Sequence, residues 1–416
     1  MIDTSVFRRE FRFFLKQPAM VWLVVAAAGL SAFSVWSGLR EVDQQNSTIE
    51  KLVEADAADR AEALAKVSDY GSAAYYTFHL TYDAPSELAF SALGERDVFP
   101  WKHRIRMLAL EGQIYETDAA NAELAQTGLF DFAFVLSVLT PLFLIVMLHD
   151  IRATERAAGR YELLAVTSKG KQTLWRSRAV VRVSLLSLSI FVPFLVGAVI
   201  SGVSAQHILL VLFVVFAQLL FWTAICLWAS ARSSSGPAIA SGLLAFWVLT
   251  TFVIPSVGDA AIESAISAPE GGDIILAQRE AVNDAWDLPK EATMDPFVAV
   301  HQEWAAHAEV ARPFEWKWYY AFQQVGDQTV EEMSKQRLGA ISRRQKLAGW
   351  VALLSPASLT QRTLSNLAET DVIAALRYQQ QVRNFHASLR AYYYPLLFKN
   401  VAFEKNIIDK LPEYKS

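Results

Sequence analysis

The sequence contains little charge and a single cysteine. Only 19% of its 416 residues are charged and 53% are hydrophobic, whereas soluble domains carry about 25% charged residues. The one cysteine, Cys226, lies inside an apolar run, so an intrachain disulfide is excluded. A net charge of −4 argues against a nucleic-acid partner. These shortages indicate a membrane protein with no redox pair.

Motifs that bind phosphate or metal are also missing from the sequence. Gly170-Lys171 lacks the upstream glycine and the following hydroxyl of a phosphate-binding loop, so this chain cannot itself cradle ATP. His301 and His307 are six residues apart, and on a helix this spacing places them on different faces rather than around one metal ion. The sequence therefore predicts no catalytic residue, no metal ligand and no cofactor in this chain.

Five apolar runs are long enough to cross a bilayer. Ionisable side chains are nearly absent from them, which argues against an ion-coupled pump. Gln218 and Thr223 are the mid-membrane candidates for lining a pathway, and helix-packing hydrogen bonds are the alternative. The predicted spans are residues 19–39, 129–148, 183–203, 208–230 and 237–256.

Lysine and arginine lie on one side of these spans. The loop 149–182 carries eight of them and the short turn 204–207 carries none, so the positive-inside rule places the loop and the N-terminus in the cytoplasm. Residues 40–128 and 257–416 are then predicted to form two mostly helical domains on the outer side, and the first is rich enough in aromatic residues to bury a core and form a small domain. A separate helix is expected at 42–68.

The N-terminal arm, residues 1–18, alternates basic and aromatic residues. Helical spacing places Phe7 and Phe14 opposite Arg8 and Arg12, which predicts a cytoplasmic interfacial helix lying on the lipid bilayer.

Beyond the fifth span, no apolar run is long enough to cross. Helices are expected within 298–310, 326–344 and 371–391. The run 347–354 is too short for a span and is predicted to be an interfacial or core helix.

The cytoplasmic loop contains a short amphipathic helix, predicted at 151–165, that has no membrane in which to bury its apolar side chains. Docking on a soluble partner would explain it, and an ordinary basic loop that follows the charge bias is the alternative. The residues predicted to make this contact are Glu155, Arg156, Gly159, Arg160, Tyr161, Glu162, Leu163 and Leu164.

This run resembles the loop between the second and third spans of ABC-2 type permeases, where a helix docks on a separate ATPase. A second run, Ser355-Pro356 followed by Leu367-Ala368-Glu369-Thr370-Asp371, resembles a signature in a branch of that family with large outer domains after spans one and five. Glu369 stands where glycine is usual. The family has six spans, so the sequence is expected to stop short of a sixth helix or to lack it.

The resemblance implies a mainly α, polytopic membrane protein with a type V exporter-like membrane domain in a bacterial inner membrane. It also implies an ATPase subunit that binds ATP and Mg, a second permease chain, identical or homologous, and export or conformational work on a periplasmic substrate or partner. The alternative function is a non-transporting membrane scaffold that assembles periplasmic proteins.

Overall fold

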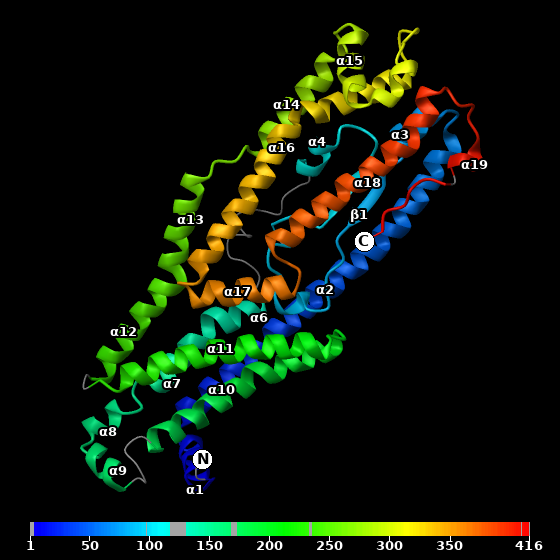
Figure 1. Cartoon of the computed structure of the whole chain (residues 1–416). Helices are drawn as coiled ribbons and strands as arrows, with labels where there is room; N and C mark the ends of the chain where they lie inside the picture. Colours follow the sequence, from blue (N-terminus) through cyan, green and yellow to red (C-terminus); the bar gives the residue numbers. More distant parts are fainter. Residues whose placement is uncertain are drawn as a thin grey trace.

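The computed structural model describes residues 4–96, 98–116, 130–167, 173–232, 235–408 and 410–415. The chain is mainly helical and has two parts, an apolar bundle and a polar head (Figure 1). Within these residues five helices are long and apolar enough to cross a membrane, and each overlaps one of the five predicted apolar runs. They are Pro18–Lys66, Phe132–Ala157, Leu174–Ile200, Ala205–Ser230 and Gly236–Ala265.

The bundle is built from the following elements. They are α1 (Thr4–Leu15), the first half of α2 (Pro18–Lys66), α6 (Phe132–Phe134), the π-helical turn η2 (Val135–Leu139), α7 (Thr140–Leu148), α8 (Ala153–Ala157), α9 (Tyr161–Thr167), α10 (Thr173–Ile200), α11 (Ala205–Ser230), α12 (Gly236–Val248) and the π-helical turn η3 (Leu249–Val253).

The head contains the second half of α2 and the remaining elements. They are α3 (Tyr70–Tyr76), β1 (His79–Tyr82), the 3-10 turn η1 (Ala89–Ser91), β2 (Lys102–Ile105), α4 (Leu110–Tyr115), α13 (Ile254–Ala265), α14 (Gly271–Asp284), α15 (Lys290–Val300), the 3-10 turn η4 (Gln302–His307), α16 (Trp316–Ala352), α17 (Pro356–Leu367), α18 (Val372–Phe398) and α19 (Lys405–Ile408).

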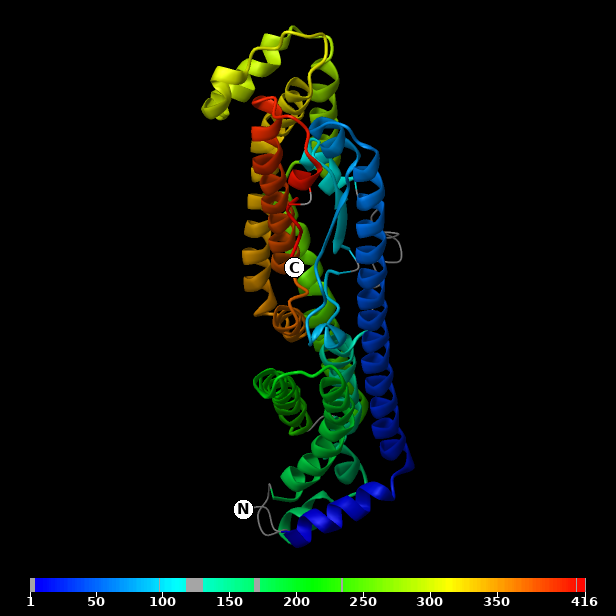
Figure 2. The ribbon, with the colours of Figure 1, turned by 90° about the vertical axis from the view of Figure 1, so that its right-hand side faces the viewer.

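The first span does not end at residue 39. Helix α2 continues without a break for 49 residues, about 74 Å at the helical rise, and joins the bundle to the head (Figure 2). The expected separate helix at 42–68 is therefore the second half of one helix. Residues 40–66 contain no glycine or proline and are rich in alanine, glutamate and glutamine, which favour the helix. Inside it, Thr48 donates to the carbonyl of Gln44.

Two other spans also differ from the predicted bounds. Helix α10 begins at Thr173 rather than 183, so Arg178 and Arg182 belong to a helix and not to the loop. The fifth helix passes through Pro255 and continues to Ala265, and the π-helical turn η3 directly precedes this proline, as η2 precedes Pro141. The basic loop is thus shorter than 149–182 and the fifth helix longer than 237–256.

Proline is accommodated in the second span by a neighbouring helix. Pro141 cannot donate to the carbonyl of Ser137, four residues earlier. The Nε2 atom of Gln218 on α11 donates to this carbonyl at 3.3 Å. Thr140 Oγ1 donates to the carbonyl of Val135 at 2.9 Å, and the backbone between them forms the π-helical turn η2. Gln218 therefore packs two spans together.

The two polar regions form one head with a shared core. Val67 and Tyr70 from the first region pack in the same buried cluster as Tyr320 and Tyr393 from the second. The hydroxyl of Tyr320 donates to the carbonyl of Gly71 at 2.8 Å. Strands β1 and β2 pair antiparallel beside this core. Neither region buries this core alone, in contrast to the predicted pair of separate domains.

The helices of the second region are longer than expected, except at one place. Helix α16 extends the expected 326–344 in both directions and includes most of 347–354, and α18 covers 371–391 apart from the capping Asp371. The expected helix at 298–310 is wrong: α15 ends at Val300, and a 3-10 turn and irregular backbone follow.

Buried ion pairs fasten α4 between the helices of the second region. Both side-chain oxygens of Glu111 accept from Arg383, at 2.7 and 2.8 Å, and one also accepts from Ser334. Asp327 on α16 accepts from the backbone N–H of Leu110 at 2.7 Å and pairs with Arg390 on α18. Asp327 therefore satisfies the first N–H groups of α4, and the two ion pairs fix the position of the helix.

Buried histidines make the stability of the head depend on pH. Burial, together with the nearby charge of Arg60, lowers the pKa of His79 to about 3, and burial lowers that of His103 to about 4. An unfolded histidine takes a proton near pH 6.5. The native state therefore binds fewer protons between these values, and the free energy of unfolding falls as the pH drops below 6.5.

We expect the thermal midpoint of the purified chain to decrease between pH 6.5 and pH 4, and to decrease less in His79→Phe. Phenylalanine keeps a ring against Phe385, which His79 contacts edge-on at 5.7 Å, and cannot take a proton. Tryptophan fluorescence during heating measures the midpoint. Equal losses in both proteins would contradict a role for His79.

Candidate functional site

The predicted loop helix is two short helices, α8 and α9, separated by Gly159. Gly159 has a φ of +68°, a left-handed conformation that glycine adopts without steric cost. The N–H of Arg160 donates to the carbonyl of Glu155 at 2.9 Å, which closes the end of α8. We call residues 153–167 the α8–α9 segment; it lies at the end of the bundle farthest from the head (Figure 1).

A buried ion network holds the α8–α9 segment against the bundle. The Nη1 atom of Arg178 on α10 donates to Glu155 at 3.2 Å, and its Nε atom donates to Glu10 on α1 at 2.9 Å. The other oxygen of Glu155 accepts from Arg160 at 2.9 Å. Glu10, Glu155 and Arg178 are each less than a tenth exposed. One arginine therefore joins three separate parts of the chain.

Aromatic contacts add a second attachment. The ring of Tyr161 stacks on that of buried Trp175 on α10, with centroids 5.5 Å apart and planes 10° apart. The Arg156 guanidinium lies 4.9 Å from the centre of the Tyr161 ring and donates to the carbonyls of Ala231 and Arg232. Arg156 thus binds the segment to the turn between α11 and α12.

The opposite side of α9 presents apolar side chains to solvent. Leu163 is 66% exposed and Val166 is 81% exposed, and Glu162 beside them is also exposed. Leu164, which the pattern predicts to make the contact, is only half-buried on its own chain. The segment is therefore rigidly attached on one side and offers a small apolar surface on the other.

Helix α1 lies across the N-terminal end of α2 and packs on α10 (Figure 2). Phe7, Arg8 and Arg12 are exposed, as an interfacial helix requires. Phe14 is on the same face of the helix as Phe7, but it is 4% exposed and belongs to the core of the bundle. The predicted helix exists, and its apolar side is divided between the bundle and the surface.

Sequence reasoning missed Glu10, Trp175 and Arg178 as members of this site. Glu10 is the one acidic residue of α1, and a lone carboxylate among basic residues was a usable signal. Arg178 was counted as part of the basic loop, because nothing in the sequence distinguishes a helical arginine that turns inward from one that faces solvent.

Helix α17 joins the head to the bundle. The second run noted in the sequence lies at its two ends, with Ser355-Pro356 at the start and residues 367–371 at the end. Ser355 caps its first turn by accepting from the N–H of Ser358, and Pro356 occupies the first helical position. Glu369 follows its end with a φ of +53°, a left-handed conformation that glycine adopts without steric cost. Asp371 then caps α18. The signature therefore describes a helix with its two caps.

The inner side of α17 contacts the spans. Leu364 and Ala368 are buried in the core cluster of the bundle. Thr360 donates to Gln218 Oε1 at 3.2 Å, so the same glutamine bonds the second span and α17. Thr223, the other predicted lining residue, is half-buried one turn farther along α11. Neither Gln218 nor Thr223 lines the large cavity beside α17.

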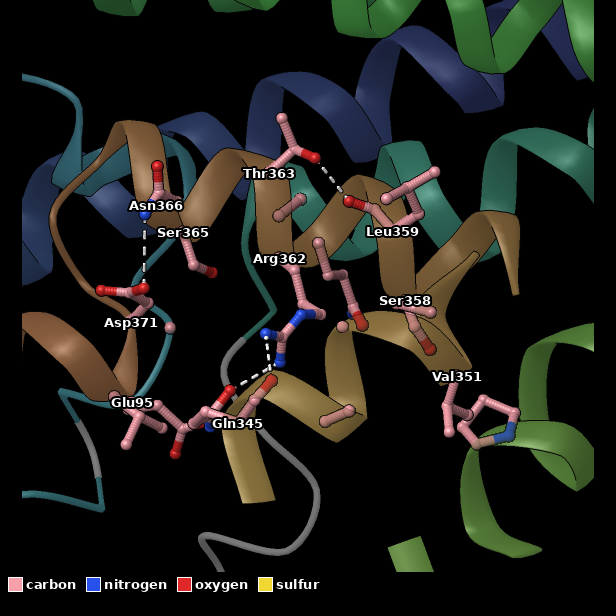
Figure 3. Close-up of a pocket in the computed structure, with 18 of the residues that line it drawn as sticks. Glu95, Gln345, Val351, Ser358, Leu359, Arg362, Thr363, Ser365, Asn366 and Asp371 are labelled. Carbon is pink, nitrogen blue, oxygen red and sulfur yellow. Dashed lines mark hydrogen bonds between the residues drawn. The ribbon is translucent and has the colours of Figure 1, made fainter. Parts of the chain in front are cut away.

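That cavity has a volume of about 740 Å³ and lies between α17, the end of α16 and the start of α13 (Figure 3). Arg362 enters it and donates to the side chain of Gln345 at 2.7 Å and to its backbone carbonyl at 3.1 Å. Carboxylates line its walls, including Asp131, which caps α6. The walls of the cavity are partly polar and partly apolar, and its polar side chains do not converge on one point. Within the described residues, no group of three or more His, Cys, Asp or Glu could hold a metal ion.

One part of the chain matches a known protein family. A family model described as a domain of unknown function, DUF3526, matches residues 274–416. This range contains α16, α17 and α18, and so includes the caps of α17. No match was found among curated proteins or among solved structures.

Proposed function

We propose that this chain is the membrane subunit of an ABC-2 type transporter in a bacterial inner membrane. The α8–α9 segment would dock on a separate cytoplasmic ATPase, and a second permease chain would complete the unit. The observation that carries the proposal is the α8–α9 segment itself. Buried charges hold it against α10 and α1, while Leu163 and Val166 remain exposed on its other side.

Charge supports the cytoplasmic placement of this segment. Arg152, Arg156, Arg160 and Arg176 lie at this end of the bundle, as do the arginines of α1. Basic residues close to the ends of spans are retained on the cytoplasmic side. The head would then lie on the periplasmic side, where it would meet a substrate or a protein partner.

The contacts offer a route by which ATPase motion would reach the head. A displacement of α8–α9 would pull on Arg178 and therefore on α10 and α1. Helix α10 packs along α2, which continues into the head, and α11 bonds α17 through Gln218. Coupling of this kind needs rigid elements with more than one arrangement. ATP and Mg would be bound by the partner, since this chain has no phosphate-binding loop.

Extraction in mild detergent followed by mass spectrometry tests the proposal. We expect a tagged full-length chain to co-purify with a soluble protein that carries a phosphate-binding loop, and the complex to hydrolyse ATP. Recovery of periplasmic proteins without any ATPase would instead favour a scaffold that assembles those proteins.

A further inference from the structure

The last turns of α16, together with Leu353 and Leu354 that follow its last residue, carry an exposed stripe of basic and apolar residues. Residues spaced three and four apart share one face of a helix. Trp350 is 70% exposed, Leu353 58% and Leu354 65%, although each is large and apolar. We call this face the α16 stripe; it consists of Arg343, Lys346, Leu347, Trp350, Leu353 and Leu354.

The stripe is ordered by polarity along the helix. The exposed Arg343 and Lys346 come first, Trp350 follows, and the leucines come last. Neither basic side chain forms an ion pair within the part of the chain that the structure describes. From Lys346 to Ala352, the last residue of α16, the chain advances about 9 Å at the helical rise, and the two leucines follow. A bilayer changes from charged headgroups to hydrocarbon over a similar depth, and tryptophan prefers the boundary.

The position of α16 places this gradient beside the fifth span. Val351, on the adjoining face, approaches α13 so closely that a Cβ added to Gly258 would lie 2.5 Å from its Cγ1. Val351 also lines the large cavity together with Pro255, so the end of α16 is level with the end of the apolar run 237–256, although the helix itself continues to Ala265. Val257, 64% exposed, continues the apolar surface along α13.

We propose that the α16 stripe is a lipid-binding surface. Leu353 and Leu354 enter the bilayer on the side of the head, and Arg343 and Lys346 meet anionic phosphate groups above them. The stripe thereby anchors the head to the membrane next to α17. This proposal is independent of any ATPase.

Lipid fits the stripe better than a second copy of the chain does. Two copies in a membrane are related by an axis along the bilayer normal, so equal depths meet. The basic end of one stripe would then face the basic end of the other. Anionic headgroups remove this repulsion, and acyl chains cover the leucines.

Depth-dependent quenching tests the proposal on the full chain in lipid nanodiscs. Cys226 is fully buried and is replaced by alanine, and a fluorophore is attached to single cysteines that replace Leu354, Lys346 or Glu331. Glu331 lies earlier on the same helix, with an exposed side chain, and is the control. We expect spin labels on acyl chains to quench the probe at 354 several times more strongly than at 331. Spin labels on headgroups should quench most strongly at 346.

Quenching at 354 no greater than at 331 would overturn the proposal. Disulfide formation between two chains that carry Leu354→Cys, without quenching, would show that a second copy covers the stripe, and this outcome also overturns it. Both results leave ATPase co-purification unaffected, so the two proposals fail separately.

Discussion

Replacing Leu163 with aspartate is expected to abolish ATPase co-purification while leaving the membrane protein intact. Leu163 is 66% exposed, so an aspartate there stays hydrated in the isolated chain and should cost little stability. In a complex the same carboxylate would be buried without a partner. That burial costs several kcal/mol, enough to disrupt a modest interface.

Leu288→Asp is the matched control, because Leu288 is a similarly exposed leucine in the head. Both variants should express, insert and melt like the parent chain, and only Leu163→Asp should lose the ATPase and its stimulated hydrolysis. Leu164→Asp should have a mixed effect, since Leu164 is half-buried on its own chain. Arg160→Glu would disturb Glu155 within the chain as well as any rim contact, so it separates the two roles poorly. If Leu163→Asp still co-purified with the ATPase, the exposed side of α9 would not be part of the docking site.

The second large effect is expected from Arg178→Ala. This change removes the cation that Glu10 and Glu155 share, and leaves each paired only with a more exposed arginine, Arg9 or Arg160. Leaving a buried charge with no partner costs about 3–5 kcal/mol, which is the upper limit here. The α8–α9 segment should detach from α10 and α1. We expect a lower thermal midpoint and rapid proteolysis within residues 153–167.

Arg176→Ala is the control, because Arg176 lies half a turn away on the same helix and is exposed. Adding Glu155→Gln to Arg178→Ala should restore part of the lost stability, since it removes one of the stranded charges. If Arg178→Ala and Arg176→Ala melt at the same temperature and are cleaved alike, the network does not hold the segment.

The spans could be predicted because apolar length alone identifies them, and all five exist as helices. Their ends could not. Pro255 and Arg40 both suggest boundaries, yet α13 uses the proline in its first turn and α2 passes Arg40 because good helix formers follow. The shared core of the head was also invisible, since the partners of Tyr70 and Val67 come from more than 200 residues along the chain.

The candidate site was predicted in part. Gly159 and Glu155 stood out by their pattern, and the structure gives each a physical role, a left-handed cap and a buried anion. The missed residues, Glu10 and Arg178, come from distant segments. A single sequence does not show which of several arginines is buried, because that depends on tertiary packing.

Photo-crosslinking from position 163 in intact cells tests the docking of α8–α9 most directly. A photoreactive amino acid at Leu163, with one at Leu288 as the control, reports which molecule touches each surface. The proposed function predicts a crosslink from 163 to a cytoplasmic protein with a phosphate-binding loop, and none from 288 to that protein. A crosslink from 163 to a periplasmic protein, or to lipid alone, would contradict it.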